Sequence, residues 1–331
     1  MRKFLLKGTL FSLPLVVLFI SVFFVDPYYL YHKHRPFSQE LYDIDYSFDQ
    51  GRRFKIITYL NNPDPYIILG ASEINVLHER NIPEEGWHSL SFGGAPLEES
   101  LDLFWRIVNE NKIERLIIAP EFIKYYNDCL GDYYIWNASH SARAYELFFN
   151  KLEYFVDKNV IRSTFFAVTS SFGYSSSLNK PKMTKNEFWK HQLDYAIRQY
   201  SQHLTKKQID NVKSRLTDVS KYCLEHHIDV KVVLPIQHLD LIALEYSEEV
   251  YPIYRDYLSF LIREFGIVYY FDFPNEISSK KELFSDPFHY LKSDIYISSI
   301  WENDSTNCYI LRNVRDIEKI DLLRMKFYKH E

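Results

Sequence analysis

The sequence predicts an α/β fold, a three-layer sandwich in which a central, mostly parallel sheet lies between helices. Short apolar runs rich in Ile, Val and Tyr recur along the chain, and segments with apolar residues at helical spacing separate them. Strands and helices that alternate in this way favour parallel strands joined by crossover helices. With 331 residues, 47% of them hydrophobic, the chain can build one large core.

Each predicted element has its own local signal. The first strand, YIILG, follows the turn-forming sequence NNPDP, and the last predicted helix ends at a glycine. In chain order, the expected strands are residues 66–70, 113–122, 228–236 and 267–273, and the expected helices are residues 98–112, 205–225 and 247–266. Residues 123–204 break the alternation and are too long for a plain connection, so we expect an insertion there that lies over the carboxyl edge of the sheet. It either forms part of a substrate groove or serves as a structural helical cap.

The amino terminus carries a candidate membrane anchor, residues 1–25. Basic residues precede an uncharged run over residues 8–25, long enough to cross a bilayer as a slightly short helix. A cleaved signal peptide would begin in the same way, but no A-x-A-like site follows the run. The basic flank favours a cytoplasmic amino terminus. We therefore expect a single-pass protein of the cytoplasmic (inner) membrane, with a lead-in over residues 26–61 and an extracytoplasmic domain over residues 62–331.

Charge and cysteine content exclude several function classes. The net charge is −5 and no long basic run occurs, so nucleic acid is a poor candidate partner. The three cysteines, Cys129, Cys223 and Cys308, are far apart and predict buried thiols rather than a disulfide framework or a metal site. No metal or nucleotide motif is present, and no cofactor is expected.

Ser72 directly follows the first strand, in YIILGASEI. At the carboxyl end of a parallel strand, a serine is placed where ligands and catalytic groups collect. It is either the N-cap of the next helix or a nucleophile.

Two further signals suit the second interpretation. In FSDPFHYL, residues 284–291, Asp286 and His289 are three residues apart, so one short turn can present both, with the carboxylate fixing the imidazole tautomer. In HSLSFGGAPLEESL, residues 88–101, Gly93 and Gly94 precede a helix, where backbone amides can hold an anion or oxyanion. Each signal also fits an ordinary turn.

Taken in this order, the three motifs resemble those of the SGNH/GDSL hydrolase superfamily. The match is to Gly70-Ala71-Ser72, to Gly93-Gly94 and to Asp286-Pro287-Phe288-His289, over about residues 62–301. The GASE sequence, the anchor and the closing FSDPFHYL resemble more closely the membrane-anchored branch that includes alginate O-acetyltransferase-like proteins and the exported protein of teichoic-acid D-alanylation.

The resemblance implies roles for individual residues. Ser72 would be the nucleophile, His289 its general base and later acid, and Asp286 the residue that orients His289. The amides of Ser72 and Gly94 would bind the oxyanion. The family usually adds an Asn after the middle strand, but here Glu121 falls near that place and Asn127 is available only if the loop folds back.

The sequence therefore predicts an extracytoplasmic serine acyltransferase that O-acetylates a surface or secreted polysaccharide, and a multi-span membrane O-acyltransferase is the expected protein partner. Two alternatives stay open. An esterase acting on carbohydrate or lipid esters would use the same residues, and a non-catalytic assembly or binding partner of a multi-span acyl exporter would use none of them.

Overall fold

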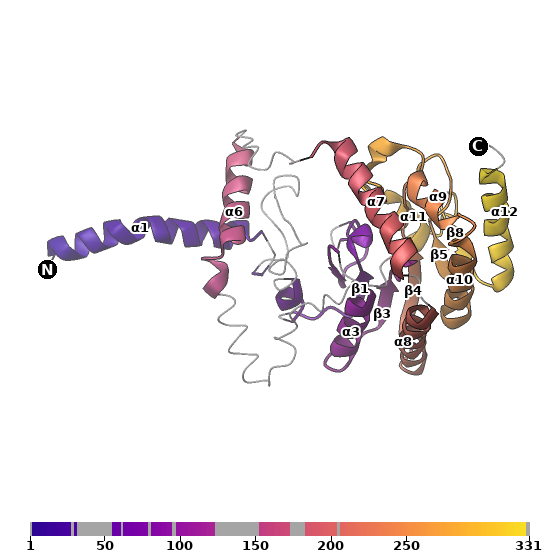
Figure 1. Ribbon diagram of the computed structural model, residues 1–331. Helices are drawn as coiled ribbons and strands as arrows, with labels where there is room; N and C mark the ends of the chain where they lie inside the picture. Colours follow the sequence, from indigo (N-terminus) through magenta and orange to yellow (C-terminus); the bar gives the residue numbers. More distant parts are fainter. Residues whose placement is uncertain are drawn as a thin grey trace. The chain divides into compact units, whose positions relative to one another are not determined.

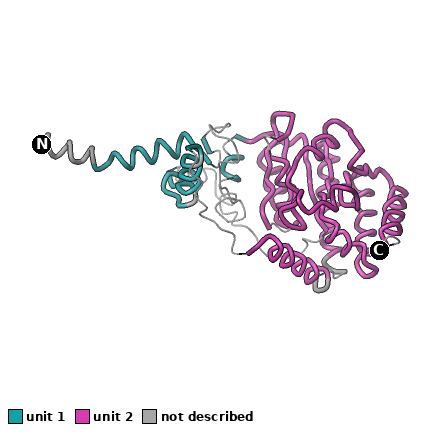
Figure 2. The backbone as a smooth tube through the Cα atoms, turned by 90° about the horizontal axis from the view of Figure 1, so that it is seen from above, with its two compact units in different colours: residues 1–62, 131–180 teal, residues 63–130, 181–331 magenta. Residues whose placement is uncertain are grey.

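The computed structural model describes residues 2–27, 30–31, 55–60, 62–78, 81–94, 97–122, 152–172, 183–203 and 206–328 (Figure 1). The chain divides into two compact units (Figure 2). Residues 1–62 and 131–180 form the first, and residues 63–130 and 181–331 form the second.

The second unit contains a six-stranded sheet, which confirms the predicted α/β class with a mostly parallel sheet. Its strands are β1 (Tyr66–Gly70), β2 (Trp87–Ser91), β3 (Arg115–Ile118), β4 (Asp229–Leu234), β5 (Val268–Tyr270) and β8 (Tyr309–Leu311). Their spatial order is β2-β1-β3-β4-β5-β8. All neighbours are parallel except β5 and β8, which pair antiparallel at one edge. The carboxyl ends of five strands therefore meet along one edge.

Helices cover both faces of this sheet. On one face, α3 (Leu97–Val108) contacts β1, and α10 (Tyr251–Phe265) contacts β4 and β5. Between them lies α8 (Lys206–Glu225), in contact with both (Figure 1). The opposite face, which includes Ile68, Ile117 and Val233, packs against α11 (Asp294–Trp301) and Trp189 of α7 (Lys185–His203).

Burial on both faces explains why β1 reads as a continuous apolar run. Ile67, Ile68 and Leu69 are all fully buried, although successive side chains of a strand point to opposite faces. Burial of each such side chain stabilises the fold by about 1.5–3 kcal/mol. The predicted buried thiols are confirmed for Cys223 and Cys308, whose pKa values burial raises to about 12. Cys129 lies outside the described residues.

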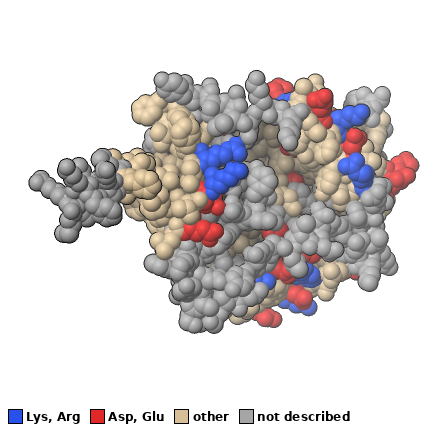
Figure 3. Space-filling model, turned by 60° about the vertical axis from the view of Figure 1, so that its left-hand side comes forward, with Lys and Arg blue, Asp and Glu red and all other residues tan. Residues whose placement is uncertain are grey.

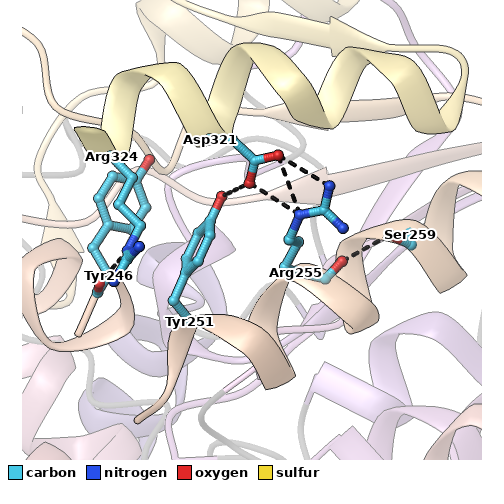
Figure 4. A network of polar contacts seen from close by, with 6 residues as sticks. All are labelled: Tyr246, Tyr251, Arg255, Ser259, Asp321 and Arg324. Carbon is cyan, nitrogen blue, oxygen red and sulfur yellow. Dashed lines mark hydrogen bonds and ion pairs between the residues drawn. The ribbon is translucent and has the colours of Figure 1, made fainter. Parts of the chain in front are cut away.

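The C-terminal helix α12 (Ile317–Phe327) is fastened to α10 by a polar cluster (Figure 4). Both carboxylate oxygens of Asp321 accept hydrogen bonds from Arg255, and the hydroxyl of Tyr251 donates to Asp321 at 2.7 Å. Farther along α12, Nε of Arg324 donates to the carbonyl of Tyr246 at 2.6 Å. These bonds tie α12 to α10 and to Tyr246, five residues before α10.

In the first unit, α1 (Arg2–Val25) contacts α6 (Lys158–Ser171). The buried carboxylate of Asp26 follows α1 and accepts hydrogen bonds from the amides of Leu30 and Tyr31 and from the hydroxyl of Tyr154, at 2.8–2.9 Å. Among the described residues, no helix combines the length and apolar character needed to span a bilayer. The membrane anchor stays a prediction.

The predicted insertion, residues 123–204, is divided between the two units. Residues 152–172 belong to the first unit, and α7 belongs to the second. Residues 123–151 and 173–182 lie outside the described part of the chain, as do residues 32–54 of the predicted lead-in.

Candidate active site

Ser72 opens a short 3-10 helix, η2 (Ser72–Ile74), directly after β1. The N-cap of this helix is Ala71, and no side chain caps it. Of the two roles that the sequence allows for Ser72, the N-cap is therefore wrong. A Cβ atom on Gly70 would lie 2.8 Å from Cγ2 of Ile74 and 3.0 Å from Cβ of Ala119, so the close return of the chain requires glycine. The Ser72 hydroxyl is half-buried at the carboxyl edge and donates to Glu73 at 3.3 Å.

Asp286 and His289 lie in direct contact. They belong to a separate two-stranded hairpin, β6 (Phe284–Asp286) and β7 (His289–Tyr290), where the sequence predicted only a turn after a strand. Nδ1 of His289 is 2.7 Å from both carboxylate oxygens of Asp286. The amide of Phe288 donates to the same carboxylate at 2.9 Å. Because an ionised carboxylate only accepts hydrogen bonds, this contact favours the tautomer with the proton on Nδ1, which leaves Nε2 as the basic nitrogen.

The two side chains of this pair differ in exposure. The carboxylate of Asp286 is 6% exposed, whereas the imidazole of His289 is 30% exposed. A buried carboxylate that supports a reachable imidazole is the arrangement that a general base requires.

Contacts from other elements hold the hairpin in place. Nζ of Lys185, on α7, donates to the carbonyl of Phe284 at 2.7 Å. The amide of His238 donates to the carbonyl of Pro287, between Asp286 and His289, at 2.9 Å. The hairpin position is therefore fixed by groups that come from two other parts of the second unit.

The hairpin lies beside the helix that carries Ser72. Strand β7 and η2 approach with Cα atoms within 8 Å, and Ile74 and Tyr290 share one apolar core cluster. The structure thus brings the Ser72 segment and the Asp286–His289 pair, more than two hundred residues apart in sequence, to one edge of the sheet.

Gly94 stands in the turn that follows β2, the neighbour of β1. Its φ is +65°, in the left-handed region that favours glycine. No atom of the described residues lies within 4 Å of the place a Cβ would take at Gly94. Asn127 lies outside the described residues.

Glu121 follows β3 and is 3% exposed, so the residue near the expected Asn position is an interior carboxylate. Burial together with the charges of Glu121 and Glu73 raises the pKa of Tyr296 well above its ordinary value. The hydroxyl of Tyr296 accepts a hydrogen bond from the amide of Ile236 at 2.9 Å and keeps its own proton. Tyr296 is therefore a neutral phenol under the influence of two acidic side chains, those of Glu121 and Glu73.

His238 is the N-cap of α9 (Leu239–Glu245). Its Nδ1 accepts from the amide of Asp240 at 3.1 Å, and burial lowers the pKa of its imidazole. The ring meets those of Trp189 and Phe284 edge to face. His238 is therefore a neutral structural residue that supports the hairpin.

In the described part of the chain, no group of three or more His, Cys, Asp or Glu side chains is placed to hold a metal ion. Basic and acidic side chains of the described residues are interspersed on the face that Figure 3 shows.

Comparison with known proteins identifies no relative: no family model, no curated protein and no solved structure matches the chain.

Proposed function

We propose that the chain is a membrane-anchored, extracytoplasmic serine acyltransferase with an SGNH-like three-layer domain. It would transfer an acyl group, with acetyl as the expected case, to a hydroxyl of a cell-surface or secreted polysaccharide. The observation that carries the proposal is the approach of β7, with His289 oriented by Asp286, to the helix that opens with Ser72.

The first half-reaction forms an acyl-serine. Oγ of Ser72 attacks the carbonyl carbon of the acyl donor, and its proton passes to Nε2 of His289. The carbonyl oxygen becomes an oxyanion that the amides of Ser72 and Gly94 bind, each donor being worth about 3 kcal/mol where such donors have been removed. The tetrahedral intermediate then breaks its bond to the leaving-group oxygen, which takes the proton back from His289.

The second half-reaction regenerates the serine. His289 removes the proton from an acceptor hydroxyl, whose oxygen attacks the acyl-serine, and the proton returns to Oγ of Ser72 when the acyl bond breaks. A sugar hydroxyl gives transfer, whereas water gives hydrolysis. The predicted anchor would hold this domain beside a multi-span membrane partner that supplies the acyl group.

The first test uses the full chain in detergent micelles with p-nitrophenyl acetate as the acyl donor. Ser72→Ala should abolish turnover, and Asp286→Asn should lower kcat by about 10²–10⁴-fold, because Asn cannot hold the required His289 tautomer. The matched control is Ser279→Ala, at an exposed serine whose hydroxyl donates to the carbonyl of Glu276, and it should keep full activity.

An acceptor experiment separates the two enzyme classes. Transfer predicts O-acetylated glycan that depends on Ser72, whereas an esterase releases acetate whether or not glycan is added. If Ser72→Ala retains the turnover of the unmodified chain, the nucleophile assignment is wrong. The non-catalytic assembly subunit is then favoured, because Glu121 stands near the place where the resemblance leads us to expect an oxyanion-binding Asn.

A further inference from the structure

Asn75 lies on the same face of η2 as Ser72. A 3-10 helix has three residues per turn, so side chains at positions i and i+3 eclipse each other. Asn75 follows Ser72 by three residues, keeps helical angles of φ −59° and ψ −19°, and closes the turn by donating its amide to the carbonyl of Ser72 at 3.1 Å. Its side-chain amide is therefore carried on the face that presents the Ser72 hydroxyl.

The orientation of this amide is fixed from the neighbouring strand. Oγ of Ser91 donates to Oδ1 of Asn75 at 2.5 Å. Since the hydroxyl proton of Ser91 lies in the bond to Asn75, the 2.9 Å contact between the two serine hydroxyls is one in which Ser89 donates to Oγ of Ser91. Both serines are fully buried. The hydrogen bond from Ser91 occupies Oδ1 of Asn75, so Nδ2, which carries two N–H groups, points away from Ser91.

Nδ2 of Asn75 has no acceptor within the part of the chain that the structure describes. Ser91 pairs in register with Gly70, and the amide of Phe92 donates to the carbonyl of Gly70 at 3.2 Å. The chain then turns at Gly94. The ends of β1 and β2 thus bring Ser72, Asn75 and the Gly94 turn to one place, with an oriented amide donor among them.

The described residues that follow β3, 119–122, include no side chain with an amide donor. The carboxylate of Glu121 is buried there and cannot donate to an oxyanion when ionised. We propose that Asn75, held by Ser91, supplies the side-chain hydrogen bond to the acyl carbonyl oxygen as it becomes negative. This inference rests on the proposed function, since it assigns a donor to the tetrahedral intermediate formed at Ser72.

Two substitutions of Asn75 separate donation from folding. Asn75→Ala removes the whole amide. Asn75→Asp keeps an oxygen that accepts from Ser91 but replaces the N–H donors with a charge. With p-nitrophenyl acetate and the full chain in micelles, we expect both to lower kcat by about 10²–10³-fold with little change in KM, because the donor acts in the transition state. Ser91→Ala should cause a smaller loss of kcat.

The matched control is Asn81→Ala, which removes a side-chain amide that donates to the carbonyl of Val76 at 2.9 Å. It should leave kcat unchanged. If Asn75→Asp keeps the kcat of the unmodified chain, or if Asn75→Ala raises KM alone, Asn75 is not an oxyanion donor.

The outcome for Ser72 distinguishes this failure from failure of the proposed function. Loss of activity in Ser72→Ala together with full activity in Asn75→Asp overturns only the assignment of Asn75. Full activity in Ser72→Ala overturns both.

Discussion

Replacing Glu245 by glutamine should remove a pH dependence of stability that comes from two carboxyl groups buried together. Glu245 ends α9 and Asp272 follows β5, and their exposed fractions are 0% and 2%. Tyr200 donates to Glu245 at 2.6 Å, and Tyr254 donates to Asp272 at 2.8 Å. The described partners of the pair are phenols and the amide of Gln237, none of which is a cation.

Burial raises the pKa of both carboxyl groups, and the charge of Asp272 raises that of Glu245 further, well above its ordinary value. Within the described residues, Oε2 of Glu245 and Oδ1 of Asp272 are buried without a hydrogen-bond partner, and one proton shared between the two carboxyl groups would satisfy both. This proton is lost from the unfolded chain near the ordinary pKa values of about 4. The resulting stabilisation is therefore complete below that pH and is lost as the pH rises toward the folded pKa, with a slope of about 1.4 kcal/mol per pH unit.

The assay is urea unfolding, followed by tryptophan fluorescence, from about pH 5 to about pH 8. In Glu245→Gln, the amide oxygen accepts from Tyr200 and the N–H donates to ionised Asp272, so the free energy of unfolding should lose this slope. Exposed Glu249→Gln should keep it. Equal slopes in Glu245→Gln and the unmodified chain would refute the shared proton.

Two further predictions concern a turn and a helix contact. Gly94→Ala and Gly266→Ala both place alanine at positive φ, +65° and +78°, so each should lower the free energy of unfolding by about 1 kcal/mol. Only Gly94→Ala should also lower kcat, as kinetics with p-nitrophenyl acetate will show; equal kcat values would contradict the role of the Gly94 amide. Asp321→Asn should cost about 1 kcal/mol in urea unfolding, because it weakens bonds from Arg255 and Tyr251 at a partly exposed site. An unchanged unfolding midpoint would show that this cluster does not fasten α12.

The interior of the sheet was predictable from sequence because its strands are buried on both faces. Residues 66–70 coincide with β1, and the strand expected in 228–236 is β4 (Asp229–Leu234). The helix expected over 205–225 is α8 (Lys206–Glu225), and the helix expected to end at Gly266 is α10 (Tyr251–Phe265). Continuous apolar runs and helical periodicity carry this information locally.

Edge elements and short elements were harder to predict. Strand β2 alternates Ser with larger residues, and β8 is only three residues long, so neither gives a strong apolar run. The hairpin that holds Asp286 and His289 depends on contacts from Lys185 and His238, which are distant in sequence. Such tertiary contacts leave no periodic signal.

The candidate site also combines residues that local motifs predict with a residue that only tertiary contacts reveal. Ser72, Gly94, Asp286 and His289 stand in short motifs at the ends of elements, and this placement drew attention to them. Asn75 was missed, because its relation to Ser72 depends on the 3-10 turn and on a hydrogen bond from β2. Its spacing of three residues from Ser72 was the one signal present in the sequence.

The most direct test of the account is whether Ser72 is a nucleophile that His289 activates. The full chain would be treated with a fluorophosphonate, which forms a bond to an activated serine with loss of fluoride, and the modified residue would be located by peptide mass spectrometry. The account predicts labelling at Ser72 that His289→Gln strongly slows. Absence of label at Ser72, or equal labelling rates with and without His289, would contradict it.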